Sequence, residues 1–283
     1  MTPAELAELG ATCAAAAEAG ARVLAARFEG PLRIEHKGRI DLVTDADRAS
    51  EAAVLGLLAA RAPGVAVLAE ESGAHAGTVA DLLFIVDPLD GTTNFAHGIP
   101  LYACTVAAFG SGQVLAGCTV DPSRGERFRA VRGGGAFLGR IGEPASTPGE
   151  PNASGPSGGE RRLRVSTPAS LGHALVCTGF PYDKRERLPE LLAAWARFTA
   201  RAQGTRRLGS AALDLAYVAA GRLDGFWEQG LKPWDVAAGQ LLVEEAGGVV
   251  TRFDGAAHDL HGLEIAAASR SLLPELLAVL NER

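Results

Sequence analysis

The sequence predicts a layered α/β fold, in which helices pack against the faces of β-sheets. Two patterns lead to this prediction. Strand-like and helix-like segments alternate through the second half of the chain, whereas short strand-like runs separated by turns dominate residues 101–137. With 47% hydrophobic and 21% charged residues, the 283-residue chain can bury a substantial core. We expect one domain over residues 1–283, with an α+β N-terminal half to about residue 166 and an α/β C-terminal half over about 167–283.

The first part of the chain contains clear helix signals. A capping-box pattern at Thr2 and Glu5 predicts a helix over residues 3–27. Thr44 begins a second predicted helix, which has acids in its first turn and ends at a Pro-Gly pair. Strands are expected as a pair near 32–43 and over 65–69.

The middle of the chain is expected to be mostly β-structure. A Gly-Ser-Gly-Gln turn at residues 110–113 predicts a hairpin, and the glycines of 133–137 predict a bend or bulge where backbones lie close together. Residues 142–160 are almost entirely Gly, Pro, Ser, Ala and Glu, which predicts a flexible surface loop. The expected strands are 101–109, 114–120, 126–131 and 162–166.

The remaining residues predict alternating strands and helices. Ser210 is a candidate cap for a helix that runs to residue 220, and Pro233 fits the first turn of another helix. A helix over 186–201 places five apolar side chains on one face, namely Leu188, Leu191, Leu192, Trp195 and Phe198. Strands are expected at 174–178, 223–228, 249–252 and 263–268, and a final helix at 272–281.

The bulk composition excludes several classes of protein. The net charge of −6 disfavours a nucleic-acid-binding surface as the main function. There is no run of about twenty apolar residues to span a membrane, and the N-terminus does not resemble a signal peptide. We therefore expect a cytoplasmic protein whose four cysteines are buried thiols.

Residues 84–95 carry the strongest chemical signal. Three apolar residues predict a buried strand that ends at Asp87, and Pro88 is expected to block continuation of the sheet. A second acid, Asp90, follows in a tight turn. The carboxyl end of a buried strand is where an α/β sheet opens into a crevice, so both acids are candidates for a functional site.

The residues directly after these acids predict an anion site. Gly91 allows the backbone to approach a ligand closely. Thr92 or Thr93 is expected to cap a helix whose free N–H groups face an anion. Two carboxylates beside such a site repel phosphate unless divalent metal ions lie between them. The stretch therefore predicts a metal-dependent phosphate site.

Acids at the ends of predicted elements extend this site. They are Asp47, Glu70, Asp87, Asp90 and Asp235. Each has a simpler explanation alone, because the helix dipole favours an acid in a first turn by roughly 0.3–1 kcal/mol and acids are common in turns. Together they predict one site, since Glu70 and Asp87 both follow buried strands whose ends converge in a layered sheet. Oxygen ligands suit Mg²⁺, and two ions about 3.5–4 Å apart can hold the water and the leaving oxygen of an in-line displacement.

These stretches resemble the inositol monophosphatase family, part of the lithium-sensitive, Mg²⁺-dependent phosphatase superfamily. The resemblance covers roughly residues 5–270, and its central motif is Asp87-Pro88-Leu89-Asp90-Gly91-Thr92-Thr93-Asn94-Phe95. Supporting motifs in the same order are residues 41–47, Glu70-Glu71-Ser72, residues 133–137 and Trp234-Asp235-Val236-Ala237-Ala238-Gly239. The resemblance implies an αβαβα sandwich of the sugar-phosphatase type.

The resemblance also implies a set of metal ligands. Glu70, Asp87 and the carbonyl of Leu89 would hold a first Mg²⁺ ion. Asp87, Asp90 and Asp235 would hold a second, and a third, weaker ion would depend on Glu70 through water. We thus expect two to three Mg²⁺ ions as cofactors.

Further roles in catalysis follow from the same resemblance. Thr92, oriented by Asp47, would accept a hydrogen bond from the attacking water. Glu71 would support the metal ligands, and the N–H groups of Gly91 and Thr92 would hold phosphate oxygens. No Cys or His stands where a covalent nucleophile would be needed. The implied reaction is direct attack of water on phosphorus.

The substrate implied by the resemblance is inositol monophosphate or a related sugar-alcohol phosphate. Its hydroxyls would face Asp90, Ala211 and Glu228, and Lys37 matches a lysine near the mouth of the site. Fructose-1,6-bisphosphatase, histidinol-phosphate phosphatase and 3′-phosphoadenosine phosphatase are alternatives, of which Glu228 disfavours only the last. Another alternative is a partner of the transcription machinery, as some bacterial relatives are. The resemblance also implies a homodimer.

Overall fold

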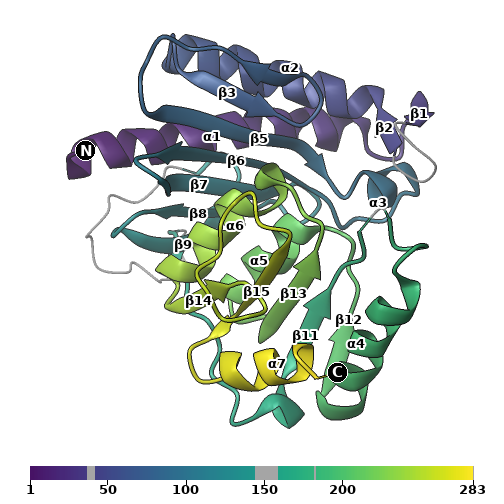
Figure 1. Cartoon of the computed structure of the whole chain (residues 1–283). Coiled ribbons are helices and arrows are strands. Elements are labelled where there is room, and N and C mark those ends of the chain that lie inside the picture. The colour runs from purple at the N-terminus through teal and green to yellow at the C-terminus, as the bar shows by residue number, and fades with distance from the viewer. Residues whose placement is uncertain (37–41, 144–158, 182, 283) are drawn as a thin grey trace.

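A computed structural model describes residues 1–36, 42–143, 159–181 and 183–282. Its helices and sheets form five layers, which confirms the predicted layered fold (Figure 1). Helices α1 (Pro3–Arg27) and α2 (Asp45–Arg61) cover one face of an eight-stranded sheet. Helices α5 (Ala211–Ala219) and α6 (Pro233–Glu245) lie between that sheet and a five-stranded sheet. The outermost layer is formed by α4 (Leu188–Arg201) and α7 (Leu273–Leu280).

The eight-stranded sheet has the order β10-β9-β8-β7-β6-β5-β3-β4. Only β3 and β5 pair in parallel within it, and the other described pairs are antiparallel. Its strands are β3 (Ala66–Ala69), β4 (Gly73–His75), β5 (Leu82–Asp90), β6 (Ala103–Gly110), β7 (Gln113–Asp121), β8 (Glu126–Val131), β9 (Gly135–Arg140) and β10 (Arg161–Arg162).

The five-stranded sheet has the order β12-β11-β13-β15-β14. Strand β11 runs parallel to β12 and β13, whereas β15 runs antiparallel to β13 and β14. Its strands are β11 (Leu175–Thr178), β12 (Gly204–Arg206), β13 (Gly225–Gln229), β14 (Gly248–Thr251) and β15 (Glu264–Ser269). The remaining elements are a small pair, β1 (Ile34–His36) and β2 (Leu42–Thr44), with α3 (Thr92–Ala96) and a 3₁₀ turn (Leu171–His173).

Local signals fixed the starts of the helices as predicted. The Thr2 N–H donates to Glu5 Oε2 at 2.6 Å, and the Glu5 N–H donates to Thr2 Oγ1 at 3.3 Å, which completes the capping box of α1. Thr44 caps α2, and Ser210 caps α5. The predicted hairpin is β6–β7, and all four cysteines are buried free thiols, as expected.

Several predictions about strands were wrong. Pro88 does not end its strand, because β5 continues to Asp90 past an irregularity in its pairing with β6. The strand expected over 162–166 is reduced to the two residues of β10. The bend or bulge predicted over 133–137 is confirmed only at its start, because residues 132–134 form a turn and strand β9 begins at Gly135. The short strands β4 and β12 carried no signal in the sequence.

The apolar face predicted for residues 186–201 is only partly buried. Leu191 and Phe198 are 8% and 0% exposed, whereas Leu188 and Leu192 are 43% and 47% exposed. The helix lies at the edge of the five-stranded sheet and packs against α7 and β12. An element at an edge has fewer neighbours to cover it, so a predicted apolar stripe can remain half open to solvent.

An ion cluster lies buried beside the segment predicted as a flexible loop. Arg127 donates to Glu18 Oε1 at 2.6 Å and to Glu160 Oε1 at 2.9 Å, and Arg129 pairs with Glu160 as well. The carbonyl of Glu143 also accepts from Arg127 at 2.9 Å. Residues 144–158 lie outside the described residues, but Glu160 is 3% exposed, so the prediction of a solvated loop was wrong at this end.

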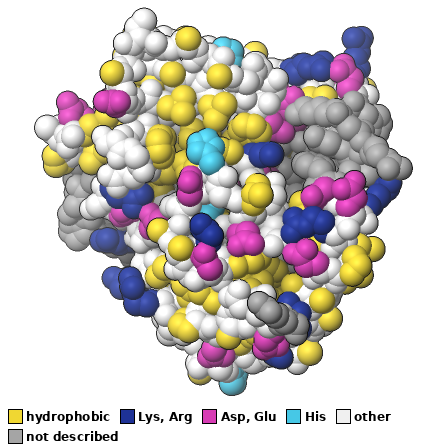
Figure 2. All heavy atoms as spheres, in the orientation of Figure 1, with side chains coloured by type: hydrophobic (Ala, Val, Ile, Leu, Met, Phe, Trp, Pro, Cys, Tyr) yellow, Lys and Arg dark blue, Asp and Glu magenta, His cyan; other side chains and the backbone are white. Residues whose placement is uncertain are grey.

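Surface charges are mixed on the face shown in Figure 2. Lys and Arg side chains there lie among Asp and Glu side chains and form no continuous basic area. Within the part of the chain that the structure describes, no helix is long and apolar enough to cross a membrane.

We expect Glu160→Ala to lower the free energy of unfolding by about 3–5 kcal/mol, because two buried guanidinium groups lose their shared counter-charge. Urea unfolding followed by circular dichroism measures this. The matched control is Glu282→Ala, which breaks an exposed pair with Arg201 and should change the midpoint little. Equal effects of the two substitutions would show that the buried cluster does not stabilise the fold.

Candidate active site

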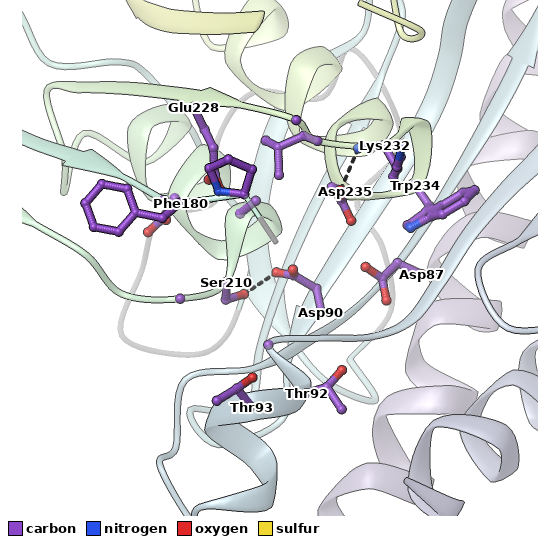
Figure 3. A pocket seen from close by; sticks show the side chains of 18 of the residues that line it. Asp87, Asp90, Thr92, Thr93, Phe180, Ser210, Glu228, Lys232, Trp234 and Asp235 are labelled. Carbon is purple, nitrogen blue, oxygen red and sulfur yellow. Dashed lines mark hydrogen bonds between the residues drawn. The ribbon is translucent and has the colours of Figure 1, made fainter. Parts of the chain in front are cut away.

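A cavity of about 450 Å³ lies where the C-terminal ends of β3 and β5 meet residues of α5, α6 and β13. Most of the residues singled out in the sequence line it. They are Glu70, Asp87, Leu89, Asp90, Gly91, Thr92, Ala211, Glu228 and Asp235. Figure 3 shows the carboxylates of Asp87, Asp90 and Asp235 pointing toward one another, with Thr92 and Thr93 on the short helix α3 beside them.

The irregularity in β5 places two of these acids on one side of the sheet. Asp87 pairs with Thr105 and Asp90 with Ala103, so three steps along β5 correspond to two steps along β6. Side chains three apart in a regular strand point to opposite faces, whereas one extra residue in the strand turns the second onto the same face as the first. Pro88 fits here because a bulge leaves one residue without a ladder hydrogen bond.

Asp87, Asp90 and Asp235 form a tight carboxylate cluster. One oxygen from each lies within 4.8 Å of the others. Burial raises the pKa of Asp87 well above its ordinary value, and the charges of Glu70, Asp90 and Asp235 raise it further. Burial likewise raises the pKa of Asp90 to about 6 and the pKa of Asp235 well above normal. Three ionised carboxylates this close repel one another, so the cluster suits a site for hard cations with oxygen ligands.

Glu70 reaches the cavity from the neighbouring strand, whereas Glu71 does not line it. Ala69 at the end of β3 pairs with Val86, and the Glu70 N–H donates to the Val86 carbonyl at 3.1 Å. The predicted convergence of the two strand ends is thus confirmed. The N–H of Glu71 donates to Glu51 Oε2 at 3.0 Å, which ties this backbone to α2.

Asp47 lies under the cavity and orients Thr92. Its side chain is fully buried, and its Oδ2 accepts from the Thr44 N–H at 2.8 Å and the Thr44 hydroxyl at 2.6 Å. Thr92 Oγ1 is 3.1 Å from Asp47 Oδ1 and 3.0 Å from the carbonyl of Leu89. The hydroxyl proton of Thr92 is therefore directed toward these two acceptors, and its lone pairs remain for a donor in the cavity.

Gly91 is the residue that turns the chain into α3. It is the N-cap of that helix, in the left-handed region with φ of 91°, so the prediction that Thr92 or Thr93 caps the helix was wrong. A Cβ at this position would lie 2.9 Å from the carbonyl oxygen of Leu101 and 3.4 Å from that of Gly209. The close approach predicted for Gly91 is therefore made to protein backbone.

The N-terminus of α5 holds Asp90 in place. Ser210 Oγ donates to Asp90 Oδ2, and the Ala212 N–H donates to the same oxygen at 2.9 Å. Ser210 was predicted as a helix cap, and the structure shows that it also donates a hydrogen bond to Asp90. Ala211, the residue between them, lines the cavity.

Glu228 forms the far wall of the cavity. It is 8% exposed, and its side chain has no hydrogen-bond partner among the described residues. Both carboxylate oxygens lie about 2.1 Å from where a Cβ of Gly179 would be, so only glycine leaves room for them. Burial, followed by the charge of Asp214, raises the pKa of Glu228 well above its ordinary value. A buried polar group without a partner is suited to bind a ligand.

The comparison with known proteins agrees with the resemblance. The sequence profile of the inositol monophosphatase family matches residues 5–283. The chain belongs to the inositol monophosphatase family. Members of this family are phosphatases, which hydrolyse phosphate monoesters, so the expectation of an enzyme of this class is confirmed.

Individual relatives of this inositol monophosphatase family member are similar over nearly their full lengths. An inositol-1-monophosphatase of Mesorhizobium japonicum is 42% identical over 87% of this chain and 85% of its own. A protein named Nus factor SuhB of Salmonella typhimurium is 38% identical over 93% and 92%. The solved structure of the extragenic suppressor protein suhB of Bartonella henselae covers 96% of this chain and 98% of its own, with 38% identity and a TM-score of 0.85.

Some residues of the family member's cavity were not singled out in the sequence. They include Phe180, Lys184, Arg207 and Asp214. Asp214 lies one helical turn after Ser210, so the predicted helix at 211–220 was the signal that could have found it. Burial raises its pKa to about 8. Lys37 lies outside the described residues.

We expect Gly91→Ala to destabilise the protein more than Gly98→Ala does. Both glycines have positive φ, at 91° and 67°, but a Cβ at Gly98 meets nothing within 4 Å. The backbone conformation alone costs about 1–2 kcal/mol at each site. Crowding against Leu101 should add about 1–3 kcal/mol at Gly91. Thermal unfolding of both variants measures the difference, and equal losses would contradict the close packing.

Proposed function

We propose that the protein is a Mg²⁺-dependent phosphatase that hydrolyses inositol monophosphate or a related sugar-alcohol phosphate. The observation that carries the proposal is the carboxylate cluster of Asp87, Asp90 and Asp235, with the Asp47–Thr92 pair at the same cavity. The carboxylate cluster and the Thr92 hydroxyl lie near the end of β5, where a water molecule and a phosphate group can be held side by side.

The donor set fits magnesium. All the side-chain ligands on offer are carboxylates, and hard oxygen donors are what Mg²⁺ prefers. Glu70, Asp87 and the Leu89 carbonyl would hold one ion, and Asp87, Asp90 and Asp235 a second. A third, weaker ion would depend on Glu70 through water. Bound Mg²⁺ would neutralise the phosphate, make water a better nucleophile and stabilise the departing alkoxide.

Thr92 and Asp47 would orient the attacking water. Because the Thr92 hydroxyl donates to Asp47 or to the Leu89 carbonyl, its oxygen can accept a proton from water in the cavity. The buried hydrogen bonds from Thr44 fix the Asp47 carboxylate, so Thr92 is held in one orientation. Such a fixed acceptor aims a water lone pair at phosphorus at little entropic cost.

The alcohol would lie toward α5 and β13. Its hydroxyls would meet the unpartnered carboxylate of Glu228, the backbone at Ala211 and Asp90. A hydroxyl-rich alcohol can donate to these acceptors and would leave Glu228 satisfied. Fructose bisphosphate and histidinol phosphate also carry hydrogen-bond donors, so both remain alternative substrates.

A substrate panel tests the proposed function. Inositol 1-phosphate, fructose 1,6-bisphosphate, histidinol phosphate and 3′-phosphoadenosine 5′-phosphate would be compared by released phosphate, with Mg²⁺ and with EDTA. We expect Mg²⁺-dependent release that is fastest from the inositol ester. Release that persists in EDTA, or no release from any ester, would overturn the proposal.

A second candidate function is binding to the transcription machinery. It is favoured by the relatives named Nus factor SuhB, which are 38% identical to this chain. A pull-down with RNA polymerase factors tests it, with a metal-site variant in parallel. Capture that survives loss of the metal site would show a binding role separate from hydrolysis. The homodimer and lithium sensitivity implied by the family stay predictions.

We expect Asp90→Asn to reduce phosphate release by about a hundredfold or more, the scale seen when one charge-stabilising group is lost. Asparagine has the same shape and keeps an oxygen for the Ala212 N–H, so the fold should be retained. Activity and circular dichroism are measured together. Asp254→Asn, the same change at an exposed acid, is the control. Near-normal Mg²⁺-dependent release from Asp90→Asn would contradict the assigned role.

A further inference from the structure

Among the described residues, three cations line the cavity, namely Lys232, which precedes α6, and Lys184 and Arg207, which lie in other segments. Lys184 precedes α4, and Arg207 follows β12, so they come from different segments. Neither side chain has an ion-pair or hydrogen-bond partner among the residues that the structure describes. Elsewhere arginines are paired bidentately, such as Arg48 with Glu35 and Arg222 with Glu126.

Lys184 and Arg207 line the same cavity and are near enough to interact electrostatically. Arg207 Nη1 would be 2.6 Å from a Cβ at Gly209, which places the guanidinium over the turn that leads into Ser210. Partial burial lowers the pKa of Lys184, and the positive charge of Arg207 lowers it further. Two neighbouring like charges repel each other, and an anion bound between them would relieve that repulsion.

The position of this pair separates it from the reacting phosphate. The phosphate would lie against Asp87 and Asp90. Lys184 belongs to the segment of Phe180, which lies beside Glu228 in the same 450 Å³ cavity and away from Asp87 (Figure 3), and Arg207 is near enough to Glu228 to lower its pKa. That volume falls in the range of about 300–1,000 Å³ typical of small-molecule sites, so it can take a ligand longer than a single phosphate.

We infer that Lys184 and Arg207 form a subsite for a second anionic group on the alcohol portion of the substrate. The inference rests on the proposed phosphatase function and adds a substrate class to it: phosphate monoesters that carry a distal phosphate or carboxylate. Arginine binds either group through two parallel N–H donors, and lysine adds a point charge.

The competing explanation is that both cations only offset the negative charge of the cavity. Arg207 does lie near enough to Asp90, Asp214 and Glu228 to lower their pKa values. Under that explanation, removal of either charge affects every substrate to the same extent. A specific subsite instead discriminates between esters that differ only at the distal group.

Two matched pairs of esters separate the explanations. Fructose 1,6-bisphosphate is compared with fructose 1-phosphate, and 6-phosphogluconate with glucitol 6-phosphate, by kcat/KM at low ionic strength. The first pair tests a distal phosphate and the second a distal carboxylate. Arg207→Gln, Lys184→Gln and the double variant are measured with Arg206→Gln as control, since Arg206 is exposed and does not line the cavity.

We expect the wild-type enzyme to prefer the anionic member of at least one pair. Each single glutamine substitution should reduce that preference about tenfold, the effect of losing one charge-assisted hydrogen bond, mainly through KM. Arg207→Lys should retain part of the preference, and Arg206→Gln all of it. Added salt should weaken the preference in the wild type, because both cations are partly solvated.

Three results would overturn the inference: no wild-type preference in either pair, equal losses for both members of a pair, or a preference that survives the double substitution. Failure of the proposed function is distinguishable, because then no ester releases phosphate in Mg²⁺. In that case calorimetric binding of the same four compounds with Mg²⁺ still tests the subsite. Binding that does not depend on Lys184 and Arg207 would then refute it.

Discussion

The extra residue in β5 is the constraint on which the site depends. It turns Asp90 onto the face already occupied by Asp87, and β5 then ends at Asp90, directly before Gly91 and α3. Hydrogen bonds hold the bulge from two sides. Ser50 Oγ donates to the Pro88 carbonyl at 2.7 Å, and the Leu89 N–H donates to Asp87 Oδ1 at 3.0 Å. These two hydrogen bonds stabilise the irregular register of β5.

One face of α2 supports the whole arrangement. Asp47, Ser50 and Glu51 follow the i, i+3, i+4 spacing of a helix face, and all three are buried. They bind Thr92, the Pro88 carbonyl and the N–H of Glu71, respectively. A polar helix face buried against a sheet is costly unless each group is satisfied, and here each one fixes a different part of the site.

Both sheets contribute residues to the site. The large sheet supplies Glu70, Asp87 and Asp90, whereas the smaller sheet supplies Glu228 from β13. Helices α5 and α6 lie between the sheets, and their N-termini bring Ser210 and Asp235 to the same point (Figures 1 and 3). The proposed metal ligands thus come from the large sheet and α6, and the proposed contacts with the alcohol come mainly from α5 and β13. Burial of several carboxylates in one cavity lowers the free energy of unfolding, a common cost of a preorganised site.

The sequence by itself determined the helix starts, the hairpin and the identity of the clustered acids. Caps, turns and motifs act within a few residues, so Thr2, Thr44 and Ser210 could be read locally. Only the tertiary structure decided that β5 continues through Pro88 and that Glu160 is buried, because their partners are distant in sequence. Likewise, Lys184 and Arg207 line one cavity only because two segments that are separate in the sequence come together in the fold, and no local sequence pattern predicts this.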